Sequence, residues 1–432
     1  MLEEKLENWV ERFKENKYLN GSLFIRYHDK ILLNQGFSFA NWEHHVSNTA
    51  TTKYRIGSLT KAFTALAIFQ LHEKGKLNVN DNITKYIPAY PNGDRISIYN
   101  CLTHTAGIPN YTSFPDFWST TMRLPSTLPQ LIDSFKDLEL HFNPGSRFEY
   151  SNSGYAILTA IIEHVSNMSY SDYILENICR PLGMVNTGCD DGIQVVPHLA
   201  SGYSYWETPI HSAYADLSFP LGAYGLYSTT EDLHLWDKAL SSSQLLPKEL
   251  TDLMFSPHLS SYACGWVVSD ISNRRCLHHF GDISGFSNEF LRFHEDNVTI
   301  IFLSNIDVTP VTQLSREIAN LLFGNKIAIP PLANAIPITN LSSFTGMYRF
   351  ENQETTLHIT IDRNELYFIV PKRYGVRNKF KLIAIEHQST KTTFVTEMIH
   401  EQLTFYYSSS NKIEQVEYKD YNNNRYIIRK ES

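Results

Sequence analysis

The chain has 432 residues, of which 42% are hydrophobic and 19% are charged, so it is long and apolar enough to bury a full core. This composition excludes an intrinsically disordered or collagen-like chain. The 37 Lys and Arg residues against 45 Asp and Glu give a formal net charge of -8. No overall positive field is available to hold a phosphate backbone, and we expect no nucleic-acid partner.

The amino-terminal segment alternates charged and apolar residues, which is typical of an amphipathic helix. It lacks the basic region and the apolar region of a signal peptide. No stretch of about 18 uncharged apolar residues occurs, so we expect no membrane-spanning helix and no membrane partner. These features predict a soluble cytoplasmic protein, or an extracellular one if a leader has been removed.

The five cysteines are scattered over the chain: Cys101, Cys179, Cys189, Cys264 and Cys276. None of them has Cys-x-x-Cys or another metal-type spacing. We therefore expect reduced thiols in the core, no metal site and no cofactor.

In chain order, the sequence first predicts a β-hairpin with strands at 22–27 and 31–33, and then a helix at 58–74 that is apolar on most sides and ends at Gly75. Residues 77–258 follow as helical segments separated by long loops. The clearest later elements are helices and strands with regular apolar spacing. The helices are expected at 155–164, 230–240 and 312–323, and the strands at 262–269, 275–280, 288–294 and 299–305.

Residues 324–343 contain three prolines and no sustained period, which is typical of a linker. Beyond them, short strands separated by polar turns predict a small antiparallel barrel. Its strands are expected at 356–361, 365–370, 380–386, 392–397, 402–407, 413–418 and 426–429. We therefore predict one domain at 1–325, a linker at 326–340 and a β-barrel domain at 341–432.

Ser58 and Lys61 form a Ser-x-x-Lys motif at the start of the predicted buried helix. Residues three apart share a helix face, so the Lys61 amine can approach the Ser58 hydroxyl, and burial can lower the lysine pKa enough to make it a base. The same spacing recurs at Ser409 and Lys412. That copy lies in a polar turn, and we assign it no catalytic role.

Two further motifs carry groups that can move or hold a proton. Tyr150 begins the triplet Tyr-Ser-Asn, where an ammonium nearby could depress the pKa of the phenol and Asn152 could orient lysine and substrate. His279 begins His-Phe-Gly at the end of a predicted strand, where the imidazole could bind an acyl substrate or tune the tyrosine. Each motif alone is also compatible with a structural role.

In their order and local context, these motifs resemble the serine β-lactamase and penicillin-binding-protein superfamily. Within it they are most similar to the class C-like branch of esterases, D-aminopeptidases and low-molecular-weight penicillin-binding proteins. The similar segments lie between residues 18 and 325, at 55–61, 102–109, 144–155, 181–184, 225–236 and 279–286. The resemblance implies an α/β fold with an antiparallel sheet flanked by helices and an inserted helical region.

The same resemblance assigns Ser58 as the nucleophile that is acylated. Lys61 and Tyr150 are expected to share the general-base work, and which of them holds the proton at each step stays open. The oxyanion hole is expected to use the backbone N–H groups of Ser58 and of Asp282, which follows Gly281.

The resemblance also implies substrate-binding roles for Asn152, His279, Gly281 and Asp282. Asn152 is expected to position the substrate amide, and His279 stands where many members carry the Lys of Lys-Thr-Gly. Phe280 stands where members usually have Ser or Thr, and Asp282 where they often have Gly. The grip on a substrate carboxylate is therefore weaker, and we do not expect efficient β-lactam hydrolysis.

The carboxy-terminal part resembles the lipocalin-like β-domains of related hydrolases, with the similar opening segment at 344–348. One interpretation is a packing or oligomerisation module. In another, the barrel tyrosines Tyr406, Tyr407, Tyr418 and Tyr421 shape a pocket over the active site.

We therefore expect a metal-free serine hydrolase that acts through an acyl-enzyme on a small ester or a D-amino-acid-containing peptide. One alternative is a penicillin-binding protein or weak β-lactamase, and another is a catalytically silent scaffold of the same fold. A third is a ligand-carrying barrel beside a vestigial hydrolase domain. The expected partners are a small-molecule or short-peptide substrate and, through the barrel, further copies in a homo-oligomer.

Overall fold

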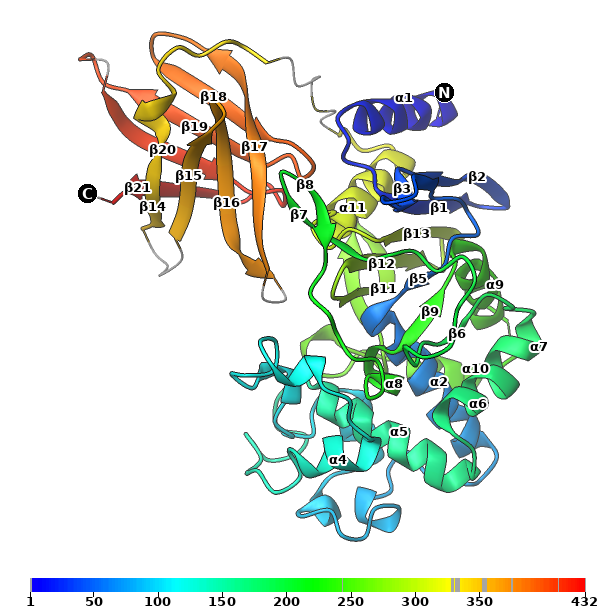
Figure 1. Ribbon diagram of the computed structural model, residues 1–432. Helices are drawn as coiled ribbons and strands as arrows, with labels where there is room; N and C mark the ends of the chain where they lie inside the picture. Colours follow the sequence, from blue (N-terminus) through cyan, green and yellow to red (C-terminus); the bar gives the residue numbers. More distant parts are fainter. Residues whose placement is uncertain are drawn as a thin grey trace.

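The computed structural model describes residues 2–242, 244–327, 330, 335–351, 356–373, 376–410 and 412–431, with the backbone alone at 371–373 and 376. An antiparallel sheet between layers of helices is followed by a β-barrel (Figure 1). The predicted fold class is confirmed. The main sheet has the order β10 (Val267–Ile271), β11 (Arg274–Ile283), β12 (Phe286–Phe293), β13 (Val298–Ser304), β1 (Gly21–Tyr27) and β2 (Lys30–Phe37).

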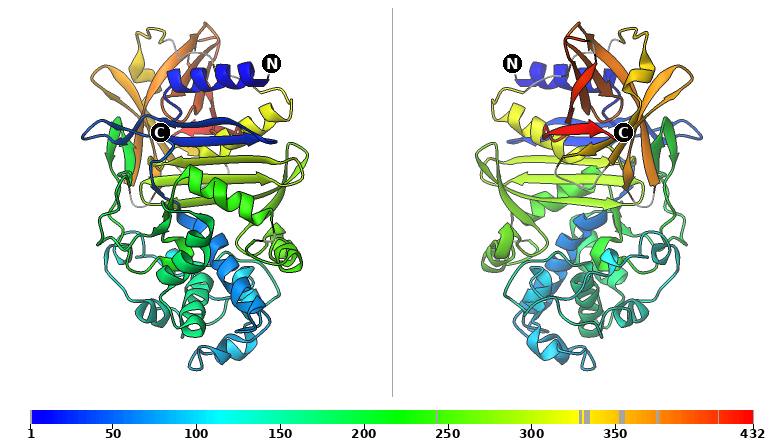
Figure 2. Two further views of the ribbon diagram at one scale, coloured as in Figure 1. Left: turned by 90° about the vertical axis from the view of Figure 1, so that its right-hand side faces the viewer. Right: turned by 90° about the vertical axis from the view of Figure 1, so that its left-hand side faces the viewer.

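Helices cover both faces of the main sheet, as the two views of Figure 2 show. On β1, Leu23 and Ile25 pack with α1 (Leu2–Glu15) and α11 (Val311–Leu322), whereas Phe24 packs into the larger cluster on the opposite face. Successive side chains of a strand point to opposite faces, so both sets are removed from water. Every residue of β12 and of β13 is accordingly buried.

Helix α2 (Thr60–Glu73) is the centre of the larger helical layer. All its residues from Thr60 to Leu71 are buried, as the apolar sequence predicts. It packs against α5 (Asn152–Ser166) and α8 (Leu221–Tyr224). The other helices are α3 (Ile98–Leu102), α4 (Leu128–Asp133), α6 (Tyr170–Ile174), α7 (Arg180–Leu182), α9 (Thr230–Leu240) and α10 (Lys248–Met254).

Two small sheets complete this part of the chain. One has the order β5 (Tyr54–Arg55), β9 (Leu226–Ser228) and β6 (Gly188–Cys189), and the other joins β3 (Phe39–Asn41) to β4 (Val46–Ser47). No helix among the described residues is both long and apolar enough to cross a membrane.

The strands near the predicted motifs differ from the sequence-based boundaries. The strand expected at 262–269 begins only at Val267, because the chain from Tyr262 turns back on itself through an isolated bridge between these two residues. The strand expected at 275–280 continues to Ile283, because β11 pairs with β12 up to the turn between them. Gly281 and Asp282 therefore lie within β11.

The carboxy-terminal part is a closed barrel of eight antiparallel strands, in which β16 pairs with β17 to complete the ring. Its first strand lies where the sequence analysis expected none. The strands are β14 (Gly346–Phe350), β15 (Thr356–Asp362), β16 (Glu365–Arg373), β17 (Val376–His387), β18 (Lys391–Thr396), β19 (Gln402–Tyr407), β20 (Ile413–Lys419) and β21 (Arg425–Lys430). The boundaries proposed at 326 and 340 stay a prediction.

A hairpin of the first part, β7 (Tyr203–Trp206) and β8 (Thr208–His211), joins the barrel sheet along β17. The Glu207 N–H donates to the carbonyl of Lys379 at 2.8 Å, and the Glu207 carboxylate pairs with the Lys379 amine. Tyr205 donates from its hydroxyl to the Glu397 carboxylate at 2.9 Å. The junction between the two parts therefore depends on strand pairing and polar contacts as well as on the connecting segment.

The five cysteines are unpaired thiols, and all except the half-buried Cys189 are buried. Burial raises the pKa of Cys101 and of Cys179 to about 12. Thiols with so high a pKa react slowly with oxidants and metals, which agrees with the predicted role as core residues.

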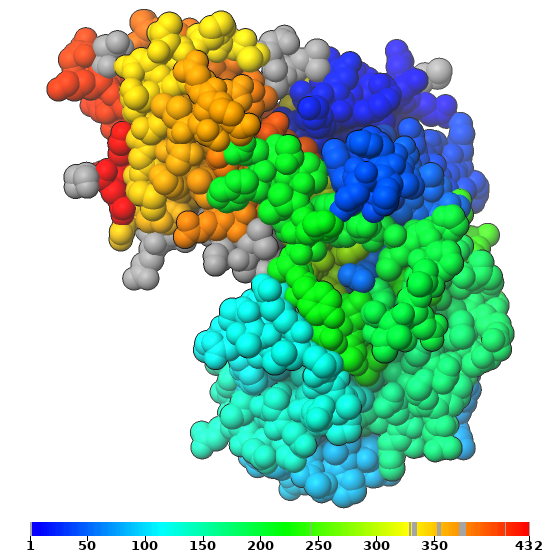
Figure 3. Space-filling view, in the orientation of Figure 1, coloured from blue at the N-terminus to red at the C-terminus, as the bar shows by residue number. Residues whose placement is uncertain are grey.

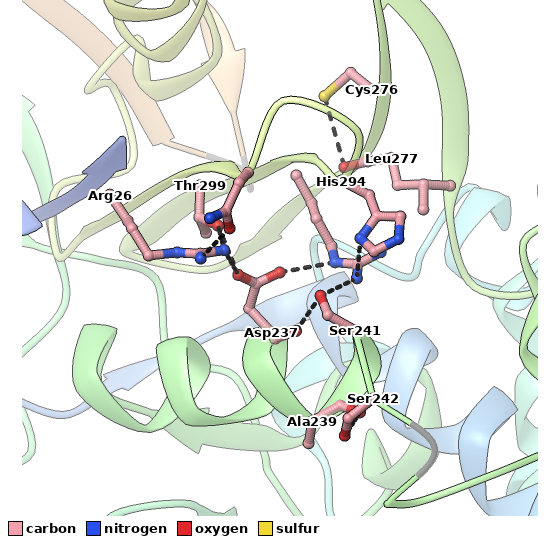
Figure 4. Close-up of polar contacts among 11 residues, drawn as sticks. Arg26, Asp237, Ala239, Ser241, Ser242, Cys276, Leu277, His294 and Thr299 are labelled. Carbon is pink, nitrogen blue, oxygen red and sulfur yellow. Dashed lines mark hydrogen bonds and ion pairs between the residues drawn. The ribbon is translucent and has the colours of Figure 1, made fainter. Parts of the chain in front are cut away.

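A buried ion-pair network ties α9 to the main sheet (Figure 4). The Asp237 carboxylate, which has no solvent exposure, lies 2.7 Å from Nε of Arg292 and 2.8 Å from Nη2 of Arg26. It also accepts a hydrogen bond of 2.6 Å from the Thr299 hydroxyl. One carboxylate thus compensates two guanidinium groups in the interior.

Removal of this carboxylate should destabilise the fold. We expect Asp237→Ala to lower the free energy of unfolding by about 3–5 kcal/mol, because it leaves buried guanidinium charge without compensation. Urea unfolding followed by circular dichroism measures the change. The matched control is Asp252→Ala, which breaks the exposed Lys248–Asp252 pair and should change the free energy by less than about 0.5 kcal/mol. Equal effects of the two substitutions would contradict this interpretation.

Candidate functional site

Ser58 lies on a 3-10 turn, Gly57–Leu59, that packs directly against β11. Gly57 has a φ of +55°, and a Cβ added there would lie 2.5 Å from the backbone nitrogen of Asp282. A Cβ on Gly281 would lie 2.1 Å from the carbonyl oxygen of Ile56. Both positions need glycine because the two backbones touch, and this approach places Ser58 next to Asp282, as an oxyanion hole built from their N–H groups requires.

Three elements bring Ser58, Lys61 and Tyr150 together. The Lys61 amine, on the first turn of α2, lies 3.1 Å from the Ser58 hydroxyl oxygen, and the Tyr150 hydroxyl donates to the same oxygen at 3.0 Å. The amine also lies 2.7 Å from Oδ1 of Asn152 and 2.7 Å from the carbonyl oxygen of Ala223. The Ser58 oxygen is thus held between an amine and a phenol.

Burial is the main cause of the shifted pKa values in this cluster. It lowers the pKa of Lys61 well below the usual value of a lysine, and the charge of Asp282 offsets only part of the effect. Burial also raises the pKa of Tyr150, although the hydrogen bond with Ser58 opposes the shift. The expectation of a depressed phenol pKa beside an ammonium is therefore wrong.

The contacts fit a neutral amine and a neutral phenol. Three oxygens surround the amine, and an ammonium would donate to each of them. A neutral amine keeps the two bonds to Asn152 and Ala223, and its lone pair can then accept from the Ser58 hydroxyl. Tyr150 then stays protonated, and its O–H group donates a hydrogen bond to the Ser58 oxygen. Which of Lys61 and Tyr150 first accepts the serine proton stays a prediction.

Asn152 begins α5, and its side chain has partners within the protein on both ends. Its Oδ1 faces Lys61, while Nδ2 donates to the Thr112 hydroxyl at 3.0 Å. Its backbone N–H donates to Oδ1 of Asn110 at 3.0 Å. In this state Asn152 positions the lysine, and contact with a substrate amide stays a prediction.

His279 forms part of the wall of the cleft and is buried. Its Nδ1 lies 2.6 Å from the carbonyl oxygen of Phe280, and its Nε2 lies 3.0 Å from the Tyr262 hydroxyl. A neutral ring with its proton on Nδ1 satisfies both contacts, because Nδ1 donates and Nε2 accepts. Burial, aided by the neighbouring Lys61, lowers the pKa of His279 to about 3.

Two residues that the sequence analysis did not single out pack around the phenol. His104 is buried, accepts the Ser151 N–H on Nδ1 at 3.1 Å, and has its ring centre 4.2 Å from that of Tyr150. Tyr262 lies 4.6 Å from His104 between ring centres and bonds to His279. His104 lies in the similar segment 102–109, which is a signal that could have found it, whereas Tyr262 belongs to no motif.

The cleft beside Ser58 has a volume of about 490 Å³, and Figure 3 shows the surface hollowed between the barrel and the helical region. Two carboxylates, Asp216 and Asp282, line it, and no Lys or Arg of the described residues does. Most of its wall is apolar or aromatic, formed by Phe117, Trp118, Met122, Phe148, Phe219 and Tyr224. Such a cleft suits a neutral or cationic substrate with an apolar group.

The part of the chain that the structure describes contains no group of three or more His, Cys, Asp or Glu side chains that could hold a metal ion.

The beta-lactamase family model matches residues 6–324. The chain belongs to this family. The "Putative penicillin-binding protein PbpX" of Bacillus subtilis (strain 168) is 31% identical over 332 residues, which cover 74% of this chain and 78% of the relative. The predicted superfamily is confirmed, and the protein is a hydrolase of the beta-lactamase family.

Solved structures share its fold. An octameric penicillin-binding protein homologue from Pyrococcus abyssi has a TM-score of 0.67 at 24% identity and covers 98% of this chain and 99% of its own. A D-stereospecific amidohydrolase from Streptomyces sp. has a TM-score of 0.64 at 22% identity and covers 76% of this chain and 98% of its own. The match to the first structure includes the barrel.

The buried His279 should make stability fall in acid. Its pKa is about 3 in the folded protein, against 6.5 for an ordinary histidine, so between these pH values the unfolded chain binds a proton that the native state does not. Its contribution to stability is complete above pH 6.5 and is lost as the pH falls towards 3.

This loss is measured against a variant without the imidazole. We expect the free energy of unfolding of the wild type to fall relative to that of His279→Gln by about 1.4 kcal/mol for each pH unit below 6. Urea titrations of both proteins at pH 7, 6 and 5 give the difference. A difference that does not change with pH would show that His279 titrates normally in the folded state.

Proposed function

We propose that this protein is a serine hydrolase that acts through an acyl-enzyme on a small ester, or on a peptide or amide that contains a D-amino acid. The observation that carries the proposal is the meeting of the Ser58 oxygen with the Lys61 amine and the Tyr150 phenol at 3.1 and 3.0 Å. A silent scaffold has no physical need for a buried lysine with a lowered pKa beside a serine.

In the proposed acylation step, the Lys61 lone pair takes the Ser58 proton while the serine oxygen bonds to the substrate carbonyl carbon. The carbonyl becomes an oxyanion, which accepts hydrogen bonds from the N–H groups of Ser58 and Asp282. The bond to the leaving group then breaks, and the leaving group takes a proton from Tyr150 or from Lys61. In deacylation the same two groups remove a proton from water while the water oxygen bonds to the acyl carbon. The bond from that carbon to the Ser58 oxygen then breaks, and a proton returns to Ser58.

The cleft supports the proposed substrate class. Its apolar wall can hold a hydrophobic acyl side chain, and Asp216 and Asp282 can attract the ammonium of an aminoacyl group. A substrate carboxylate finds no Lys or Arg among the described residues of the wall. We further propose that Asn152 contacts the substrate amide and that Gly281 lets the substrate lie against β11.

The names of similar proteins bear on the substrate and on the oligomeric state of this chain. The description of the Streptomyces structure as a D-stereospecific amidohydrolase supports a D-amino-acyl substrate, and the name of PbpX keeps penicillin binding as the alternative. The Pyrococcus structure is described as octameric, which supports our proposal that the barrel takes part in a homo-oligomer.

Covalent labelling tests the nucleophile. We expect intact-mass measurement after incubation with a fluorophosphonate to show one adduct, which peptide mapping locates at Ser58. Ser58→Ala should lose the adduct and at least about 10³-fold of the turnover of p-nitrophenyl esters or D-amino acid anilides, because no other group can form the acyl-enzyme. Ser409→Ala is the matched control, since it changes the other Ser-x-x-Lys copy. Turnover that is retained in Ser58→Ala would show that Ser58 is not the nucleophile.

A substrate panel tests the preference against β-lactams. We expect kcat/KM for a short-chain p-nitrophenyl ester to exceed that for nitrocefin by at least about 10-fold, because a lost charge-assisted hydrogen bond to the carboxylate costs about 1.5–3 kcal/mol. Phe280→Thr combined with Asp282→Gly should lower this ratio of kcat/KM values. Asp216→Asn alone tests whether the other carboxylate of the cleft contributes to the ratio. Nitrocefin turned over faster than every ester and anilide would restore the β-lactamase alternative.

A further inference from the structure

A second cavity, of about 620 Å³, lies where the barrel meets the main sheet. Its wall combines the barrel residues Phe350 and Tyr418 with Phe280 of β11 and with the segment 308–312 that leads into α11. Phe280 also contributes to the lining of the cleft beside Ser58, so this one residue borders both cavities. The volume lies within the range of sites that hold small molecules.

The lining of this cavity has a narrow chemical character. It contains the side chains of five aromatic residues: Phe280, Phe350, Phe380, Tyr418 and Tyr421. Among the described residues, Glu401 is its only carboxylic acid, and no Lys, Arg or His lines it. Once ionised, a single carboxyl group within an aromatic wall attracts cations and repels anions.

The backbone of Glu401 is fixed by hydrogen bonds, whereas its carboxyl group has few partners. Only 4% of the residue is exposed, and its backbone is fixed by two hydrogen bonds of 2.8 Å with Thr396, one to its carbonyl and one from its N–H to the threonine hydroxyl. The Tyr418 hydroxyl bonds to its carboxyl group. Its Oε2 has no hydrogen-bond partner among the residues that the structure describes. Burial raises the pKa of Glu401 to about 8.

We propose that this cavity binds an organic ammonium compound with an apolar body. The apolar body would pack on the aromatic rings, whose faces also attract the cation, and the ammonium would donate to the Glu401 carboxylate. An anion finds no positive partner among the described residues of the wall, and a neutral apolar molecule leaves Glu401 uncompensated. The proposal does not depend on the chemistry of Ser58.

The test uses the full chain at pH 9, where Glu401 with its pKa of about 8 is mostly ionised and 2-phenylethylamine is still mostly a cation. Isothermal titration calorimetry should show binding of this amine, at least about 10-fold weaker binding of the neutral 2-phenylethanol, and none of 3-phenylpropionate. Glu401→Gln keeps the shape of the side chain and should weaken the amine at least about 10-fold, since the counter-charge is lost. The matched control Glu365→Gln changes a half-exposed barrel glutamate and should leave the affinity unchanged.

Two further variants separate this site from others. Asp282→Asn removes a charge from the catalytic cleft and should not change amine binding, whereas Val308→Trp fills the second cavity without touching the carboxyl and should abolish it. If Glu401→Gln does not fold, as judged by circular dichroism, Val308→Trp tests whether the amine binds in the second cavity. The proposal is overturned if no binding is detected at millimolar amine, if the alcohol binds as well as the amine, if Glu401→Gln binds normally, or if Asp282→Asn abolishes binding.

Discussion

The removal of Lys61 from water is the constraint on which the site depends. Helix α2 is buried on all sides through Leu71, so a lysine on its first turn has no route for its amine to solvent. An ammonium there would lose its hydration, and the protein instead provides two acceptors, Oδ1 of Asn152 and the Ala223 carbonyl, and one hydroxyl on Ser58. The packing that stabilises the fold thereby also lowers the pKa of this lysine.

The same packing explains the two glycines at the edge of β11. A helix that must reach the centre of the domain brings the turn Gly57–Leu59 against the strand, so that a side chain at position 57 or 281 would overlap a backbone atom. The benefit is a fixed distance between the backbones of Ser58 and Asp282, which does not have to be formed when substrate binds. Stability and preorganisation therefore have one origin, the close contact of turn and strand.

Local periodicity was enough to predict the helix that carries Lys61, although this helix begins at Thr60 and Ser58 lies on the 3-10 turn before it. The approach of Tyr150 followed from family resemblance, since no local rule links residues 92 positions apart. Ala223, Thr112 and Tyr262 escaped prediction because a carbonyl, a hydroxyl or a ring becomes a partner only through the tertiary fold. The pairing of the β7–β8 hairpin with the barrel also escaped prediction, because a single strand contact leaves no periodic signal in the sequence.

Phe280 shows how the second domain bears on the first. Its neighbour His279 faces Tyr262 and the phenol, and successive strand residues point to opposite faces, so Phe280 turns towards the cluster of α1 and α11 and towards the barrel. In that position the ring borders a cavity whose wall also holds Phe350 and Phe380 of the barrel, so an aromatic side chain matches its surroundings. The aromatic wall on the barrel side therefore gives a physical reason for Phe280 at a position where related proteins usually have Ser or Thr.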